Sequence, residues 1–243
     1  MAHKITYKAF GDRAILIEWE AEICASISNT ILAFQQKIGA FENRNIADTI
    51  VGYTSLTIVY KMRIVDYLNE VAILKKINAS KDMGLKKSSF SWEIPVCYDL
   101  EFGIDLQEIS KATNLEISEI MKLHSQNLYR VYFIGFLPGF LYLGGLNKQL
   151  FFDRKPNPRL KVAKGAVAIG GEQTGVYPSE SAGGWNIIGK TPVNFFNINE
   201  DSPCFAKAGD FIKFVSIDKS EFLQIEKEVK ANAYQISKTL RND

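Results

Sequence analysis

The sequence has few of the residues from which metal sites and disulfide frameworks are built. Its 243 residues include two histidines, His3 and His124, and three cysteines, Cys24, Cys97 and Cys204, which lie far apart. Tetrahedral metal sites need clustered cysteine or histidine ligands, and disulfide frameworks need paired cysteines. We therefore expect no metal in this protein, reduced thiols and a cytoplasmic location.

Long apolar runs and a strong charge of one sign are also missing. No apolar run approaches the roughly 18 residues that a membrane-spanning helix needs, and the first residues lack the apolar core of a signal peptide. The net charge of +2 is too small to indicate a nucleic-acid partner. A hydrophobic share of 47% with 23% charged residues is typical of a globular protein. We expect neither a membrane nor a nucleic acid as partner.

The spacing of apolar residues in the first third of the chain predicts a β-β-α-β-β-α unit. Two strands are expected within residues 4–19, two more at 46–52 and 55–61, and helices at 23–39 and 64–79. The polar stretch 81–91 that follows is a linker candidate. This pattern predicts a small α/β sandwich domain over residues 1–85.

The remaining residues, 86–243, are predicted to form a second domain. Short strands separated by glycine turns favour a closed or sandwiched β structure, which makes the whole chain α+β. Strands are expected at 93–98, 129–136, 166–170, 186–188, 193–198 and 211–216, and helices at 105–113, 116–126 and from Lys219 onward.

Glycine and proline are concentrated between Gly135 and Pro192, which contain eleven of the seventeen glycines and five of the seven prolines. Glycine permits positive φ and close backbone approach, and proline fixes φ, so this density prescribes the backbone in detail. Large aromatic residues alternate with the glycines in two dense motifs, 135–143 and 181–192. Such a region is expected to build a pocket or a contact surface.

Residues 184–191 match the nucleotide-binding pattern G-x-x-x-x-G-K-[ST]. A true phosphate-binding loop leads into a helix, whereas residues 192–198 are strand-like. Trp185, Ile187 and Ile188 are also bulky for a loop that curls around phosphates. We interpret the match as coincidence.

Six basic residues and one acid lie between Lys148 and Lys164. Arg159, Lys161 and Lys164 either protect an edge strand by their charge or form a row of cations for an anionic ligand. His124 is either a core residue or the proton shuttle of a site. Gln173 and Tyr177 either hydrogen-bond an amide substrate or satisfy the loop backbone.

No Ser-His-Asp, Cys-His or paired-carboxylate arrangement is apparent in the sequence, so the chain does not resemble a self-sufficient hydrolase. The candidate catalytic residues are His124 and Lys164. The candidate substrate-binding residues are Arg159, Gln173, Tyr177, Ser181, Trp185 and Thr191, although for Trp185 packing is favoured over stacking on a ligand.

Taken in order, several motifs resemble those of a known family. They are Gly11–Ala14, Glu93–Tyr98, Phe102–Leu106, His124, Tyr129–Val131, Gly135–Leu143, Pro158–Arg159, Ala168–Pro192 and Gly209–Phe214. The family is that of the 5-oxoprolinase B subunit, also described as Kip-inhibitor-like, as allophanate hydrolase subunit 1, or as carboxyltransferase domain, subdomain C and D. Lys190 departs from its usual arginine, and Ile104, Ala163 and Ala182 depart from its usual prolines.

The resemblance implies an N-terminal α/β domain and a C-terminal cyclophilin-like β-barrel. It also implies partner subunits A and C, which together with this chain would hydrolyse the lactam 5-oxo-L-proline to L-glutamate with ATP as co-substrate. The sequence does not show where the ATP site lies. Two other roles remain open: an inhibitor that binds a sensor histidine kinase, and a subunit of an allophanate hydrolase or urea carboxylase-type enzyme.

Overall fold

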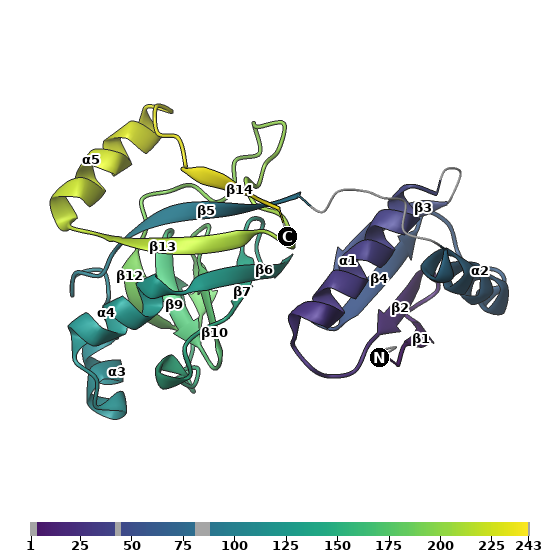
Figure 1. Cartoon of the computed structure of the whole chain (residues 1–243), viewed down its shortest axis with the longest axis horizontal. Helices are drawn as coiled ribbons and strands as arrows, with labels where there is room; N and C mark the ends of the chain where they lie inside the picture. Colours follow the sequence, from purple (N-terminus) through teal and green to yellow (C-terminus); the bar gives the residue numbers. More distant parts are fainter. Residues whose placement is uncertain (1–3, 42–44, 81–87, 243) are drawn as a thin grey trace. The chain divides into compact units, whose positions relative to one another are not determined.

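A computed structural model describes residues 4–41, 45–80 and 88–242, and the chain forms two compact units, residues 1–87 and 88–243 (Figure 1). Each unit has a hydrophobic core of its own. The predicted α+β class is confirmed. The domain boundary expected at residue 85, and most of the expected linker, lie outside the described residues.

Unit 1 is an antiparallel four-stranded sheet, in the order β1-β2-β4-β3, together with two helices. Its strands are β1 (Thr6–Ala9), β2 (Ala14–Glu18), β3 (Ile46–Val51) and β4 (Ser55–Tyr60), and its helices are α1 (Ala25–Gly39) and α2 (Tyr67–Ala79). Helix α1 buries Ile27, Ile31, Phe34 and Ile38, the spacing that predicted it.

Both helices of unit 1 begin later than predicted. Helix α1 starts at Ala25, and Ile23 lies before it with 51% of its surface exposed. Helix α2 starts at Tyr67 because Asp66 caps it, its side chain accepting a hydrogen bond from the backbone N–H of Asn69 at 3.0 Å.

Unit 2 is built around a closed seven-stranded barrel, in the order β12-β9-β10-β7-β6-β13-β5 with β12 pairing back to β5. Its pairings are antiparallel except that of β13 with β5. Strand β14 pairs antiparallel with the first half of β5, from Ser88 to Trp92. The barrel strands are β5 (Ser88–Cys97), β6 (Leu128–Ile134), β7 (Leu141–Gly144), β9 (Ala166–Gly170), β10 (Gln173–Val176), β12 (Asn186–Lys190) and β13 (Phe211–Ile217), followed by β14 (Lys238–Asn242).

Three helices and a small sheet complete unit 2. Helices α3 (Leu106–Thr113) and α4 (Ile117–Gln126) contribute Leu106, Ile109 and Ile120 to the barrel core. A single 3-10 turn, η1, spans Lys148–Leu150. The two-stranded sheet pairs β8 (Arg159–Val162) with β11 (Ser181–Gly183), and α5 (Lys219–Lys230) follows β13.

Two predictions for unit 2 were wrong, and four strands were missed. Strand β5 begins at Ser88 instead of residue 93, and β7, β10, β11 and β14 were not predicted. Residues 193–198 form no strand: Val193 and Phe195 alternate into the core, but the nearby backbone bonds are local, such as the one from Asn197 to the carbonyl of Pro203. Side-chain burial therefore alternates in this segment as it does in a strand, although the segment pairs with no neighbouring strand.

Within the described ranges, no helix combines the length and the apolar character that crossing a bilayer requires.

Candidate functional site

The glycine-rich motifs form a layer of aromatic side chains on the outer face of the barrel. This aromatic layer consists of Phe140, Tyr177 and Trp185, which belong to a buried cluster separate from the barrel core, and of the partly buried Tyr142, which packs against them. The ring of Phe140 meets those of Tyr177 and Trp185 edge to face, each at 5.5 Å between centroids. Edge-to-face pairs of this kind hold rings in fixed orientations.

Glycines of the adjacent strands make room for this layer. A Cβ at Gly170 would lie 2.6 Å from the indole of Trp185, and one at Gly175 would lie 3.2 Å from both Phe140 and Trp185. The indole therefore lies directly against the backbone of β9. This contact explains why the sequence combines glycines with large aromatics, and it identifies Trp185 as a packed residue with 6% exposure.

Tyr177 lies deeper in the same layer, with 2% exposure and its hydroxyl against the backbone of Gly183. Burial raises the pKa of Tyr177, although a backbone hydrogen bond from Trp185 and the charges of Arg154 and Arg159 act in the opposite direction. The phenol is thus a neutral hydrogen-bonding group held close to two guanidinium groups.

A buried carboxylate, Asp105, anchors the basic edge of this layer. Its Oδ1 accepts a hydrogen bond from Nη2 of Arg159 at 2.6 Å and lies 3.1 Å from Nζ of Lys155. Its Oδ2 accepts the backbone N–H of Ile187 at 2.7 Å. Nζ of Lys155 also donates to Glu108 at 2.7 Å. Arg159, predicted to bind substrate, is therefore neutralised within the chain.

Lys164 and Thr191 meet at a corner built by Gly165. The N–H of Gly165 donates to the carbonyl of Tyr177 at 2.8 Å, and its own carbonyl accepts from Thr191 at 2.9 Å. A Cβ at Gly165, which has φ of 82°, would lie 2.4 Å from the Thr191 carbonyl. Thr191 is buried, whereas the side chain of Lys164 is exposed.

Gln173 and Ser181 lie at two other edges of the site. Gln173 pairs in register with Gly170, so its side chain leaves the sheet on the same face as Trp185. Its Oε1 is enclosed and has no hydrogen-bond donor among the described residues. Ser181 opens β11 opposite Val162 and donates to the carbonyl of Ala182 at 3.2 Å.

His124 lies inside the barrel, away from the aromatic layer, with no exposed surface. Its Nδ1 is 2.7 Å from the Tyr98 hydroxyl, and its Nε2 is 2.8 Å from the Thr174 hydroxyl. The Thr174 hydroxyl donates to the carbonyl of Ala168, so it accepts from Nε2–H, and Tyr98 donates to Nδ1. The ring stacks on Phe214 at 4.6 Å.

This environment keeps the imidazole neutral, because burial lowers the pKa of His124 from 6.5 to about 3. Both ring nitrogens are occupied by groups of the core itself. The geometry favours the core interpretation of His124, and its role in proton transfer stays a prediction.

The segment that matches the nucleotide-binding pattern is a barrel strand. Asn186–Lys190 forms β12, which pairs with β9 and, at Lys190, with Cys97 of β5. The amino group of Lys190 lies over the rings of Phe102 and Phe222, at 5.5 and 5.6 Å from their centroids. Its backbone groups serve the sheet and residues 191–198 form no helix, which favours the interpretation of the match as coincidence.

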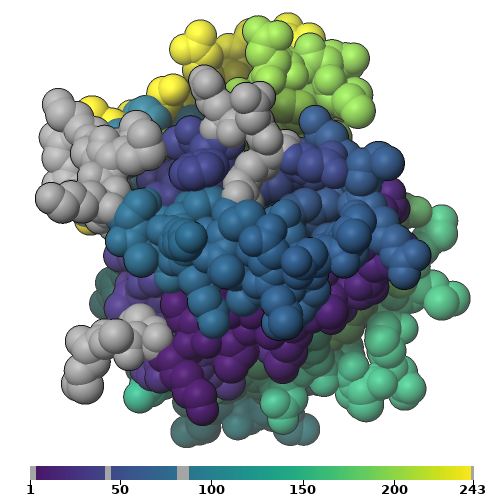
Figure 2. All heavy atoms as spheres, turned by 90° about the vertical axis from the view of Figure 1, so that its right-hand side faces the viewer, coloured from purple at the N-terminus to yellow at the C-terminus, as the bar shows by residue number. Residues whose placement is uncertain are grey.

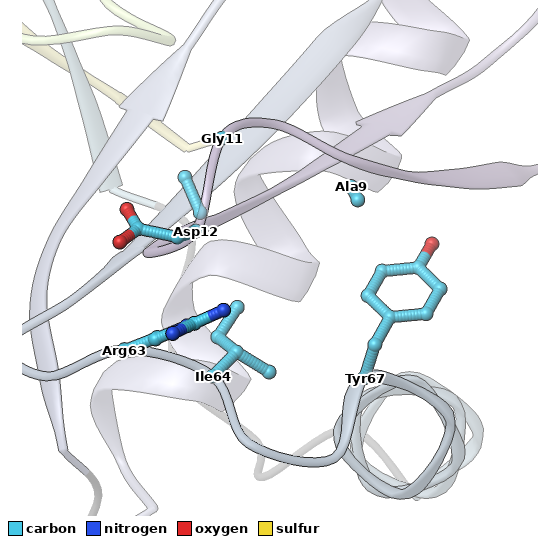
Figure 3. Close-up of a pocket in the computed structure, with 7 residues that line it drawn as sticks. Ala9, Gly11, Asp12, Arg63, Ile64 and Tyr67 are labelled. Carbon is cyan, nitrogen blue, oxygen red and sulfur yellow. The ribbon is translucent and has the colours of Figure 1, made fainter.

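A shallow pocket in unit 1 is lined by the motif around Gly11 and by the segment before α2 (Figure 3). The N–H of Ile64 donates to the carbonyl of Asp12 at 2.9 Å, which holds the two segments together. Figure 2 shows α2 in blue beside the purple β1–β2 hairpin on this face. The pocket contains none of the candidate residues predicted from the sequence.

In the described part of the chain, no three histidine, cysteine, aspartate or glutamate side chains are grouped to hold a metal ion. Asp105 was missed as a site residue, because its partners Lys155 and Arg159 are some fifty residues away along the chain. From the sequence, Asp105 was recognised only as part of the motif Phe102–Leu106.

Comparisons with known proteins agree with this architecture. The family description "Carboxyltransferase domain, subdomain C and D" matches residues 5–206. The 5-oxoprolinase B subunit of Bacillus subtilis (strain 168) is 33% identical over 94% of this chain and 99% of its own length. The 5-oxoprolinase B subunit of Haemophilus influenzae is 37% identical over 82% of this chain and 95% of its own length.

Two solved structures share the fold. The structure of TTHA0988 superposes with a TM-score of 0.74 at 30% identity, over 85% of this chain and 40% of that longer one. The Kluyveromyces lactis urea amidolyase has a TM-score of 0.82 over 98% of this chain and 16% of its own, and at 18% identity it shows the fold alone. From the matched family description and the relatives of nearly equal length, the chain belongs to the carboxyltransferase domain, subdomain C and D family.

Proposed function

We propose that this chain is the B subunit of an ATP-dependent 5-oxoprolinase, which hydrolyses 5-oxo-L-proline to L-glutamate together with subunits A and C. The relatives of nearly equal length are named as B subunits of 5-oxoprolinase. The observation that carries the proposal is this match over nearly the full length of both chains. The aromatic layer with basic residues at its edge is the candidate place for a small anionic ring compound.

In this scheme the described residues contribute binding groups, and the attacking nucleophile is water. ATP activates the unreactive lactam by phosphorylating its carbonyl oxygen, after which water attacks a better electrophile. Water addition must be followed by cleavage of the ring C–N bond, with a proton delivered to nitrogen, which leaves the γ-acyl phosphate of glutamate. A second water then hydrolyses this acyl phosphate to L-glutamate and inorganic phosphate. Since His124 is enclosed in the core, another chain of the complex or solvent is the better-placed proton source.

Lys164 keeps its predicted role in this scheme. Its side chain is exposed, and the backbone of the next residue, Gly165, is hydrogen-bonded to Tyr177 and Thr191. It is placed to stabilise the negative charge of the substrate carboxylate or of the developing phosphate. Arg159 contributes through its ion pair with Asp105, which fixes the edge of the site.

The test is to co-express the chain with candidate subunits A and C and to measure glutamate and ADP formed from 5-oxo-L-proline and ATP. We expect ATP hydrolysis that depends on the lactam and requires all three chains. Absence of glutamate from a complex that assembles fully would contradict the proposed function.

Two variants then test the residues. Arg159→Ala and Lys164→Ala are expected to lower the rate at least tenfold, whereas Lys161→Ala is the matched control. Nζ of Lys161 lies 3.3 Å from Glu180, and both side chains are largely exposed. Unaltered rates for both site variants would contradict the assignment of Arg159 and Lys164 to the site, while the proposed overall reaction would stand.

A further inference from the structure

We propose that Arg154, stacked on Trp185, is the group that binds the carboxylate of a small cyclic amide at this site. The proposal rests on the proposed function for the identity of that amide, 5-oxo-L-proline. Arg154 was not among the residues predicted from the sequence, and its assignment follows from the distribution of charge around the aromatic layer.

Three of the six basic residues between Lys148 and Lys164 are already paired. Lys155 and Arg159 share Asp105, and Lys161 pairs with Glu180. The other three, Lys148, Arg154 and Lys164, make no ion pair or side-chain hydrogen bond with any residue that the structure describes. An anionic ligand therefore binds these three cations more readily, because binding to a paired cation would first break its ion pair with a carboxylate.

Among these three cations, within the described ranges, Arg154 is the one that contacts the aromatic layer. Its guanidinium carbon lies 5.5 Å from the centroid of the Trp185 ring. A guanidinium over an aromatic face is held by the cation–π attraction while its N–H groups remain available at its edge. Arginine in this arrangement can grip a carboxylate with two parallel hydrogen bonds.

The backbone on both sides of Arg154 is fixed to the residues directly before and after Trp185. The carbonyl of Asp153 accepts a hydrogen bond from the Asn186 side chain at 2.7 Å, and the N–H of Lys155 donates to the carbonyl of Gly184 at 2.7 Å. These two short hydrogen bonds thus fix the position of the Arg154 backbone relative to the Trp185 ring. A positioned cation loses less freedom on binding its ligand than an unrestrained surface residue does.

The same contacts define what the ligand must look like. The carboxylate pairs with the free edge of the guanidinium, and the remaining ring lies at the rim of the aromatic layer, where Tyr142 is only partly buried. Its size is small, because Tyr177 and Trp185 are themselves packed and leave no deep cavity between them. A five-membered lactam with one carboxylate meets these requirements.

The test compares two lactams on the assembled complex, 5-oxo-L-proline and 2-pyrrolidone, which has the same ring without the carboxylate. Isothermal titration calorimetry gives both affinities for the wild type, Arg154→Gln and Arg154→Lys. We expect Arg154→Gln to weaken 5-oxo-L-proline about 10- to 100-fold, the range for a charge-assisted hydrogen-bonded pair. The affinity for 2-pyrrolidone should stay unchanged, and Arg154→Lys should restore part of the loss.

Steady-state kinetics supply a second readout. A residue that binds the carboxylate equally in the ground and transition states raises KM and leaves kcat nearly unchanged. Lys148→Gln is the matched control, since Lys148 is a free cation of the same segment but lies in η1, away from Trp185. That control should alter neither KM nor affinity.

The outcomes separate the two proposals. If the wild-type complex turns over 5-oxo-L-proline and Arg154→Gln leaves KM and affinity unaltered, the Arg154 assignment is overturned and the proposed function stands. If the complex neither binds nor hydrolyses 5-oxo-L-proline but binds another cyclic carboxylate only when Arg154 is present, the site stands and the substrate is wrong. If no cyclic carboxylate binds, both are overturned.

Discussion

Nη2 of Arg159 lies 2.6 Å from Oδ1 of Asp105, a carboxylate whose side chain is 4% exposed. The pair joins the N-terminal end of α3 to β8 across more than fifty residues of sequence. A buried carboxylate is expensive unless it is fully paired, and here the Lys155 ammonium and the N–H of Ile187 supply the remaining bonds. The pair is therefore structural first, and it fixes the edge of the aromatic layer.

Replacing Asp105 by asparagine should destabilise unit 2 by about 2 kcal/mol, because two cations lose their shared carboxylate. The value lies below that of a fully enclosed pair, since 26% of the Arg159 side chain is exposed. Urea denaturation measures the change. Glu108→Gln is the control: it removes the other, largely exposed partner of Lys155 and should cost less than about 0.5 kcal/mol. Equal effects of the two variants would contradict the central role of Asp105.

The buried His124 should make stability depend on pH in a defined window. Its folded-state pKa of about 3 lies below its ordinary value of 6.5, so the unfolded chain binds a proton that the folded chain rejects. The stability from this residue is complete above pH 6.5 and is lost as the pH falls toward 3. The slope is roughly 1.4 kcal/mol per pH unit.

Urea denaturation at several pH values between 4 and 6.5 measures this slope in the wild type and in His124→Gln. The variant should be less stable at neutral pH, because it loses the ring packing on Phe214. Its stability should nevertheless fall less steeply as the pH is lowered. Parallel curves for the two proteins would mean that His124 is protonated in the folded state.

Gly170→Ala should disturb the aromatic layer where Gly184→Ala does not. The new methyl group at position 170 would lie 2.6 Å from the Trp185 indole, whereas at 184 the nearest atom is 3.4 Å away. We expect a loss of about 1–3 kcal/mol for the first variant, as for overpacked sites, and a change in near-ultraviolet circular dichroism. The control should retain the wild-type stability and circular dichroism. A Gly170→Ala variant with unchanged stability and spectrum would show that the Trp185 ring can shift to accommodate the methyl group.

The sequence predicted those features of the fold that depend on local periodicity. Helix α1 and strands β2, β4 and β9 were found because apolar residues recur at spacings of 3.6 or 2. Strand β14 was missed because its residues alternate little, and it exists through its pairing with β5. Residues 193–198 were wrongly predicted as a strand because burial alternates there without a hydrogen-bonding partner.

The residue types that form the site could be predicted from the sequence, but which residues pair with one another could not. The glycine-rich region and its aromatics pointed to Tyr177 and Trp185, which do lie together. The basic cluster pointed to Arg159, but its partner Asp105 belongs to another part of the chain. Which cation remains free is a property of the folded molecule, and so Arg154 could not be singled out from the sequence.

The position of Lys190 gives a test of the apparent nucleotide-binding motif. Its ammonium group lies over the rings of Phe102 and Phe222, on a strand whose backbone groups are used by the sheet. Lys190→Met should therefore leave the KM for ATP of the assembled complex within about twofold of the wild-type value, while lowering stability by about 1 kcal/mol through loss of the cation–π contacts. Lys190→Arg should retain both properties, since arginine supports the same contacts. A large increase in KM for ATP in Lys190→Met, with Lys190→Arg unaffected, would instead place a nucleotide phosphate at this strand.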